Sequence, residues 1–74
     1  MDRIFDGRRL RQARLDAGVS LEQAAEAAGR SVFTVRAYEV GSVEPPVNVL
    51  ARLGRLLLHP IDDFLTETGA GAAA

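Results

Sequence analysis

The stretch SVFTVRAYEVG, from Ser31 to Gly41, has the signals of a short helix with a defined start and end. The Ser31 side chain can cap the first turn by accepting a backbone N–H bond. Gly41 stands where a chain leaves a helix in the left-handed conformation. At about 100° per residue, Val35 and Tyr38 share one face, but the opposite face is too apolar for the solvent side of a surface helix. That second face consists of Val32, Phe33, Arg36 and Val40.

The rest of the chain predicts four more helices and no strand. Asp6 is a candidate N-cap for the first helix, and Ser20 with Gln23 is a candidate capping box for the second. Gly54 lies inside a later helix, where a glycine is unfavourable, and it therefore indicates close approach of a neighbouring helix. The four further helices are expected over residues 7–17, 20–29, 47–58 and 61–66.

The 74 residues are enough for one domain and lie near the lower limit at which a chain folds alone. We expect a helical domain over residues 7–66, preceded by an N-terminal arm (1–6) and followed by a flexible tail (67–74). The chain has no cysteine and one histidine, which excludes a disulfide framework and a metal site built on cysteine or histidine. No metal and no cofactor are expected.

No apolar run approaches the length of a membrane span, and the N-terminus lacks the apolar core of a signal peptide. We therefore expect a cytoplasmic protein that makes no membrane contact.

The net charge is −1, but residues 1–36 hold seven arginines against five acidic residues, and residues 37–74 hold two arginines against five acidic residues. All nine cationic residues are arginine and none is lysine, which suits planar contacts to phosphates and base edges, although a GC-rich genome explains the same composition.

An enzyme is not expected, because catalysis needs a base, a nucleophile or a metal converging in a pocket. A core of this size leaves no room for such a pocket, and no small-molecule substrate is expected. Asp62 and Asp63 are adjacent on a predicted helix and diverge, so they cannot work as a paired acid and base.

The predicted helices over 20–29 and 31–41 form a helix–turn–helix. Small residues at the junction allow the two helices to approach closely at a steep angle; they are Ala24, Ala25 and Ala28. This geometry directs the helix over 31–41 outward, where its N-terminal half can enter a DNA major groove. Periodicity alone leaves a purely structural helical bundle as the alternative.

Residues 7–65 resemble the Cro and lambda-repressor family of helix–turn–helix proteins, the Xre type. The resemblance implies a compact, all-α, five-helix domain whose third helix reads double-stranded DNA, usually as a homodimer on a two-fold operator. The implied function is a repressor-like transcriptional regulator. The matching positions are Leu10, Arg14, Gly18, Ser20, Ala25, Gly29, Ser31, Val35, Tyr38, Glu39, Gly41, Pro45, Leu53, Leu57 and Phe64.

The resemblance also implies which residues contact DNA, although the family is usually polar at several of these positions. The expected base-reading residues are Val32, Phe33, Arg36 and Ala37. The expected phosphate contacts are Ser20, Leu21, Arg30, Ser31 and Ser42.

The apolar character of this face leaves three interpretations open. In the first, Val32 and Phe33 contact thymine methyl groups while Arg36 makes a bidentate contact to guanine. In the second, Leu21, Val32, Phe33 and Val40 form a patch that binds a partner protein, as in an antitoxin-like component. In the third, Phe33 folds against the preceding helix and serves only packing.

Two further sets of residues follow from the resemblance. Arg14 and Glu39 are expected to form a partly buried salt bridge between the first helix and the end of the third. The C-terminal region is more apolar than a short helix pair can bury, and Leu58 stands where the family usually has glycine. We therefore expect a dimer interface formed by Leu56, Leu58, Ile61 and Leu65.

Overall fold

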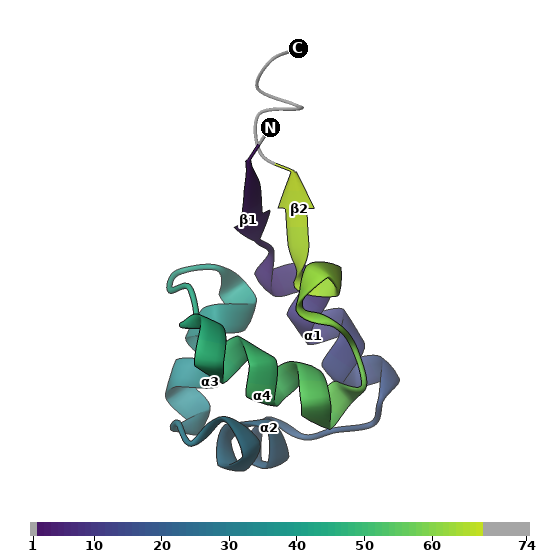
Figure 1. The fold of residues 1–74 in the computed structure, drawn as a ribbon. Helices are drawn as coiled ribbons and strands as arrows, with labels where there is room; N and C mark the ends of the chain where they lie inside the picture. Colours follow the sequence, from purple (N-terminus) through teal and green to yellow (C-terminus); the bar gives the residue numbers. More distant parts are fainter. Residues whose placement is uncertain (1, 68–74) are drawn as a thin grey trace.

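The computed structural model describes residues 2–67 of the chain. Four α-helices form the body, and a two-stranded sheet projects from one end of it (Figure 1). In chain order the elements are β1 (Arg3–Phe5), α1 (Gly7–Asp16), α2 (Leu21–Ala28), α3 (Val32–Val40), α4 (Val47–Leu57), a 3-10 turn (Ile61–Phe64) and β2 (Leu65–Glu67).

The first three helices begin at the side chains that the sequence predicted. The Asp6 carboxylate accepts a bond from the backbone N–H of Arg8 at 2.9 Å and caps α1. Ser20 and Gln23 form a reciprocal capping box at the start of α2. The Ser31 hydroxyl accepts a backbone N–H bond in the first turn of α3. These caps satisfy backbone donors that a helix leaves unpaired, and they define where each helix starts.

Three of the four α-helices, α2 to α4, end at a left-handed residue, and two of these residues are glycines as predicted. Gly29 ends α2 with φ of 67°, and Gly41 ends α3 with φ of 85°. Leu58 ends α4 with φ of 60°, and it is the one non-glycine residue between 2 and 67 with a positive φ. A leucine in this conformation is strained, because its Cβ crowds the backbone.

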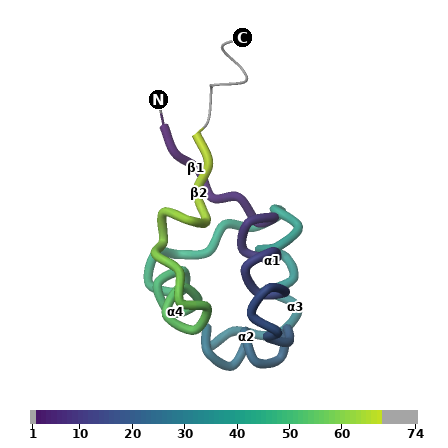
Figure 2. The backbone as a smooth tube through the Cα atoms, turned by 90° about the vertical axis from the view of Figure 1, so that its right-hand side faces the viewer, coloured from purple at the N-terminus to yellow at the C-terminus, as the bar shows by residue number. Residues whose placement is uncertain are grey.

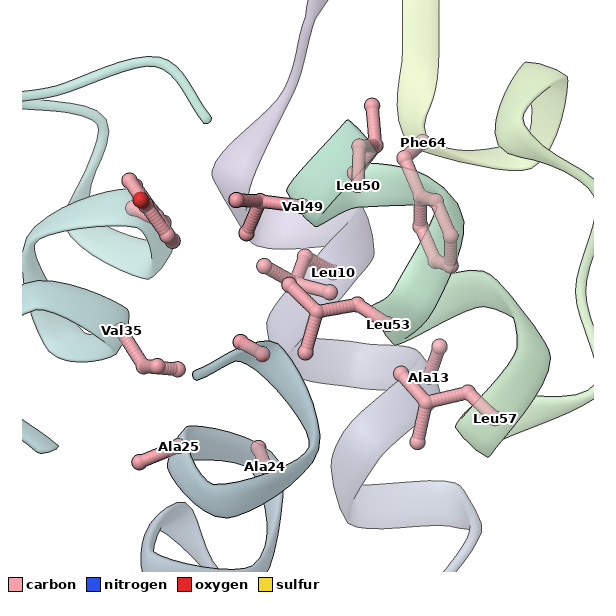
Figure 3. Close-up of a cluster of buried hydrophobic side chains, with 12 residues drawn as sticks. Leu10, Ala13, Ala24, Ala25, Val35, Val49, Leu50, Leu53, Leu57 and Phe64 are labelled. Carbon is pink, nitrogen blue, oxygen red and sulfur yellow. The ribbon is translucent and has the colours of Figure 1, made fainter. Parts of the chain in front are cut away.

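The core lies where the four helices and the 3-10 turn meet (Figure 3). α2 packs against both α3 and α4, and α1 packs against α3. Figure 2 shows α2 across one end of the body and α4 on the side opposite to α1. The buried side chains are Leu10, Ala13, Ala24, Ala25, Ala28, Val35, Tyr38, Val49, Leu50, Leu53, Leu57 and Phe64.

Two glycines permit close backbone approaches. A Cβ on Gly7 would overlap the carbonyl oxygens of Tyr38 and Glu39, so α1 meets the end of α3 without an intervening side chain. A Cβ on Gly54 would lie 2.6 Å from the carbonyl oxygen of His59. The partner of Gly54 is therefore the turn that follows α4, and the expectation of a neighbouring helix there was wrong.

The all-α, five-helix expectation was wrong at the C-terminal end. Residues 61–64 make only a 3-10 turn, because Phe64 must enter the core and the chain is extended immediately afterwards. β2 then pairs antiparallel with β1, with Ile4 opposite Thr66. The Asp6 N–H donates to the Phe64 carbonyl at 2.8 Å, and Arg3 forms an ion pair with Asp62 at 3.5 Å.

This sheet includes residues from both segments outside the expected helical domain. β1 lies within the expected N-terminal arm, and Glu67 is the last residue of β2. The remainder of the expected tail, 68–74, lies outside the described residues.

The capping interaction of Asp6 predicts a specific acid dependence of stability. The hydrogen bond from the Arg8 guanidinium, helped by the backbone N–H of Arg8 and opposed by burial, lowers the pKa of Asp6 below its ordinary value. Because the folded pKa is the lower one, this contribution is present above about pH 4 and is lost as the pH falls through the folded value. We expect Asp6→Asn, which keeps a capping oxygen, to be less stable than the wild type at pH 7, with the difference shrinking below about pH 4.

Urea denaturation between pH 2.5 and 7 measures this difference. Asp2→Asn, a change at an exposed carboxylate next to β1, is the matched control and should follow the wild-type curve. Parallel curves for the wild type and Asp6→Asn across the whole range would contradict the prediction.

Candidate nucleic-acid interface

α3 is held on one side and open on the other. Its inner side places Val35 and Tyr38 in the core. Its outer side exposes Arg36, and leaves Phe33 82% and Val40 72% exposed. The exposure of Phe33 excludes the interpretation in which this ring folds against the preceding helix. The unusual face of the opening stretch is therefore a surface of the folded protein.

The structure brings three of the four expected base-reading residues to this surface. Phe33, Arg36 and Ala37 line a shallow hollow of about 170 Å³, together with Val40 and Ser42. Helical spacing placed Val40 on this face, although Val40 was not among the expected base-reading residues.

Val32 and Leu21 differ from the expectation, because both are half-buried and pack against the core. Helical spacing does place Leu21 on the same stripe as the buried Ala24, Ala25 and Ala28, so its inward side chain agrees with the pattern of α2. The spacing of α3 placed Val32 on the outer face, and the inward lean of that side chain is the difference. Of the protein-binding patch in the second interpretation, only Phe33 and Val40 are exposed, because Leu21 and Val32 are half-buried.

Three of the expected phosphate contacts lie at the starts of α2 and α3. The Ser20 and Ser31 hydroxyl oxygens accept N–H bonds from Gln23 and Thr34, each at 3.0 Å. Leu21 has an inward side chain, so its contribution there is its backbone N–H, which has no partner within the helix. Helix N-termini of this kind favour anions such as phosphate.

The other two expected phosphate contacts differ in availability. Arg30 is exposed in the turn between α2 and α3, and its Nη1 donates to the Gly29 carbonyl at 3.0 Å, leaving other guanidinium donors. The Ser42 hydroxyl donates to the Ala37 carbonyl at 3.3 Å. It must give up this bond to donate to a phosphate.

Arg14 and Glu39 lie together beneath this surface. Arg14 Nε is 2.6 Å from Glu39 Oε2, and Nη2 is 3.1 Å from Oε1, which makes a bidentate pair. The two side chains are only 10% and 4% exposed. The hydrogen bond to Glu39 raises the pKa of Arg14 above its ordinary value, against the effect of burial. Arg14 Nη1 also donates to the Val19 carbonyl at 2.9 Å, a contact that sequence patterns could not show.

The residues expected at a dimer interface do not share one helix. Leu56 is partly exposed on α4, and Leu58 in the following turn is 89% exposed. Ile61 is half-buried against the core. Leu65 lies in β2 opposite Phe5, rather than in a fifth helix.

The acidic residues after α4 contact separate partners. Asp62 pairs with Arg3, and Asp63 Oδ2 lies 2.7 Å from His59 Nδ1. Between residues 2 and 67 no three acidic or histidine side chains gather as metal ligands. None of the helices in that part of the chain has the length and apolarity needed to cross a bilayer.

Comparison with known proteins identifies the family of this fold. The family described as "Helix-turn-helix domain" matches residues 7–63. The chain belongs to this helix-turn-helix family. The connection of α2 to α3 through Gly29 agrees with the helix-turn-helix that the resemblance implied, whereas the 3-10 turn and β2 stand where it implied a fifth helix.

Solved structures of three regulators are similar to this chain. The clp gene regulator ClgR from Corynebacterium glutamicum is 33% identical with a TM-score of 0.74, and the match covers 78% of this chain and 62% of that one. The restriction-modification controller protein C.AhdI from Aeromonas hydrophila is 26% identical with a TM-score of 0.72, covering 78% and 88%.

The N-terminal DNA-binding domain of the biofilm regulator SinR from Bacillus subtilis is 26% identical with a TM-score of 0.69, covering 85% and 93%. SinR in complex with DNA gives 26% identity and a TM-score of 0.68 over 76% and 90%. No curated protein matched the sequence. The chain spans about three fifths of the ClgR chain in the structure described above.

The Arg14–Glu39 pair predicts a large loss of stability when one partner is removed. Arg14→Ala or Glu39→Ala should each lower the free energy of unfolding by about 3–5 kcal/mol, because a buried charge is left without its partner. The double variant Arg14→Met/Glu39→Leu should lose less than the sum of the two, since no charge remains buried.

Urea denaturation measures these differences, and a variant unfolded without urea sets a lower limit. Arg3→Ala is the matched control, because the Arg3–Asp62 pair is exposed and should contribute about 0–1 kcal/mol. Single variants within 1 kcal/mol of the wild type would contradict the prediction.

Proposed function

We propose that this protein binds double-stranded DNA in a sequence-specific manner and regulates transcription, acting in the cytoplasm. The observation that carries the proposal is the outward face of α3 with exposed Arg36 and Phe33, in a helix-turn-helix domain. The N-terminal half of α3 enters the major groove, as in other helix-turn-helix proteins. Arg36 supplies the planar fork that matches O6 and N7 of guanine.

The surroundings of α3 supply the contacts that position it. The N-termini of α2 and α3 offer unpaired backbone N–H groups, and Arg30 between them adds a positive charge. Such contacts to phosphates set the register of the protein on the duplex but carry no sequence information. The named regulators of similar structure, and SinR in complex with DNA, support the same function. A repressor-like role follows from the family resemblance.

The alternative function is capture of a partner protein by the same surface. The exposure of Phe33 and Val40 favours it as well, because exposed apolar clusters mark interaction sites. Arg36 distinguishes the two functions: it makes no ion pair with any residue from 2 to 67 and stands beside Phe33 at the hollow. We favour DNA because a bare guanidinium at this position of α3 is suited to a base edge.

Selection of bound duplexes from random DNA tests this function directly. We expect an enriched sequence that contains a guanine contacted by Arg36. Arg36→Ala should weaken binding to that sequence by about 1–3 kcal/mol and should relax the preference at one guanine position. The measurement is an electrophoretic mobility shift on the selected duplex.

Arg11→Ala is the matched control for charge, because Arg11 is an exposed arginine on α1. It should leave the preference at every position unchanged. Failure to enrich any sequence would contradict the function. Equal affinity and preference for wild type and Arg36→Ala would show that α3 does not read the DNA as proposed.

We further propose that two copies associate through the end of α4. Leu58 keeps an apolar side chain 89% exposed in a left-handed conformation that favours glycine. It borders an open hollow of about 400 Å³ whose lining includes Gly54, Pro60 and Ile61. A two-fold pair through this region would present two α3 helices to half-sites about one DNA turn apart.

Leu58→Gly should separate the effect of the left-handed conformation on stability from the effect of the leucine side chain on self-association. The variant should raise the free energy of unfolding of the isolated chain by up to about 1 kcal/mol, because the strain at φ of 60° is removed. It should also weaken self-association, because an exposed apolar side chain is lost. Urea denaturation at low protein concentration measures the change in stability. Sedimentation equilibrium measures the change in self-association. A wild-type monomer at high concentration, both free and on DNA, would rule out the dimer.

A further inference from the structure

The outer face of α3 carries a stripe of apolar side chains that the fold does not use. Phe33, Ala37 and Val40 follow one another at helical spacing along α3. Phe33 and Val40 are not members of the core, and with Arg36 and Ser42 they line the hollow on this face. An apolar stripe left open in this way is suited to an apolar ligand group.

The DNA major groove offers one apolar group at its base edges, the C5 methyl group of thymine. 5-Methylcytosine carries the same methyl group on the same ring carbon. The two pyrimidines differ at C4, where thymine has a carbonyl oxygen and cytosine has an amino group. A surface distinguishes the two base pairs only if a polar group faces C4 of the pyrimidine or C6 of the purine paired with it.

The hollow has no uncommitted polar side chain for this purpose. Its one hydroxyl belongs to Ser42 and donates to the carbonyl of Ala37 at 3.3 Å. Its one charged group, Arg36, is the group that the proposed function assigns to guanine. The remaining lining groups, Phe33 and Val40 among them, are apolar. This stripe can therefore contact the methyl group, but it has no group that would distinguish the C4 substituents.

The spacing along α3 places the methyl group next to the guanine. Phe33 and Arg36 are three positions apart, so their Cβ atoms are neighbours at about 5–6 Å on the helix surface. Their side chains therefore reach adjacent base pairs when α3 lies in the groove. The target is a C5-methylated pyrimidine in the base pair beside a guanine.

We propose that the outer face of α3 recognises a C5-methylated pyrimidine beside a guanine and accepts 5-methylcytosine in place of thymine. This inference rests on the proposed DNA-binding function and names the chemical group that the site selects. It makes the protein a responder to cytosine methylation at any site where cytosine occupies this position. Burial of one methyl group predicts a gain of about fourfold in affinity for each half-site.

The experiment starts from the duplex selected by the wild-type protein. Replacing each thymine by uracil, one at a time, locates the position where loss of the methyl group weakens binding. Cytosine and 5-methylcytosine, each paired with guanine, are then compared at that position. We expect a ratio of about four for thymine over uracil and a similar ratio for 5-methylcytosine over cytosine.

Phe33→Ala should bring both ratios to about one. Because Phe33 is exposed, the variant should fold, and its urea denaturation midpoint verifies this. Leu15→Ala removes a partly exposed apolar side chain on α1 and should leave both ratios at the wild-type values.

The outcomes separate this inference from the function on which it rests. Two ratios near one on a duplex that the wild type binds sequence-specifically would overturn methyl recognition and leave the DNA-binding function standing. A thymine effect without a 5-methylcytosine effect would show that the site senses C4 and would overturn the inference as well. Ratios that survive Phe33→Ala would place the methyl contact elsewhere. Failure to bind any duplex would instead overturn the DNA-binding function.

Discussion

The buried Arg14–Glu39 pair is the constraint that positions the working surface of this small domain. It joins α1 to the last turn of α3, and the third guanidinium nitrogen fixes the Val19 carbonyl just before α2 begins. One side chain therefore connects α1, α3 and the chain segment that leads into α2. A buried ion pair is not by itself a large source of stability, because removing two charges from water opposes their attraction. Its value here is geometric: a bidentate pair allows one orientation of α3.

That orientation divides α3 between two tasks. Val35 and Tyr38 bind the helix to the core, so its backbone cannot move independently of α2 and α1. Phe33 and Arg36 project from a helix that is already rigid, so the backbone of α3 does not have to become ordered when these side chains bind a ligand. The buried cluster that gives this rigidity includes the small alanines of α2, which allow α2 to pack closely against α3 and α4.

The sequence was most informative where the determining interaction is local. The caps at Asp6, Ser20 and Ser31 and the left-handed ends at Gly29 and Gly41 each involve residues within a few positions of one another, and each was predicted. The inward lean of Val32 was not, because it depends on the space that neighbouring helices leave.

The β1–β2 sheet was missed for a related reason. Its strands are three residues long, carry no alternating pattern, and lie about sixty positions apart in the chain. Only the core position of Phe64, with the Asp6 N–H bound to its carbonyl, brings them together. The resemblance to a family of regulators supplied the remaining information, because no periodicity distinguishes a DNA-reading face from any other exposed helix face.

The same sheet determines how the domain responds to a pulling force. β1 and β2 are antiparallel, and the two ends of the described chain emerge side by side at the end of the molecule opposite to α2 (Figures 1 and 2). A load applied to both ends would therefore open the strand pair one hydrogen bond at a time, like a zipper, instead of shearing all its bonds together. After the strands separate, the load would reach the Asp6–Phe64 bond and then the ring of Phe64 in the core. α1 follows Asp6 directly and α4 leads into the turn that holds Phe64, so these two helices would be loaded next, and α2 and α3 last.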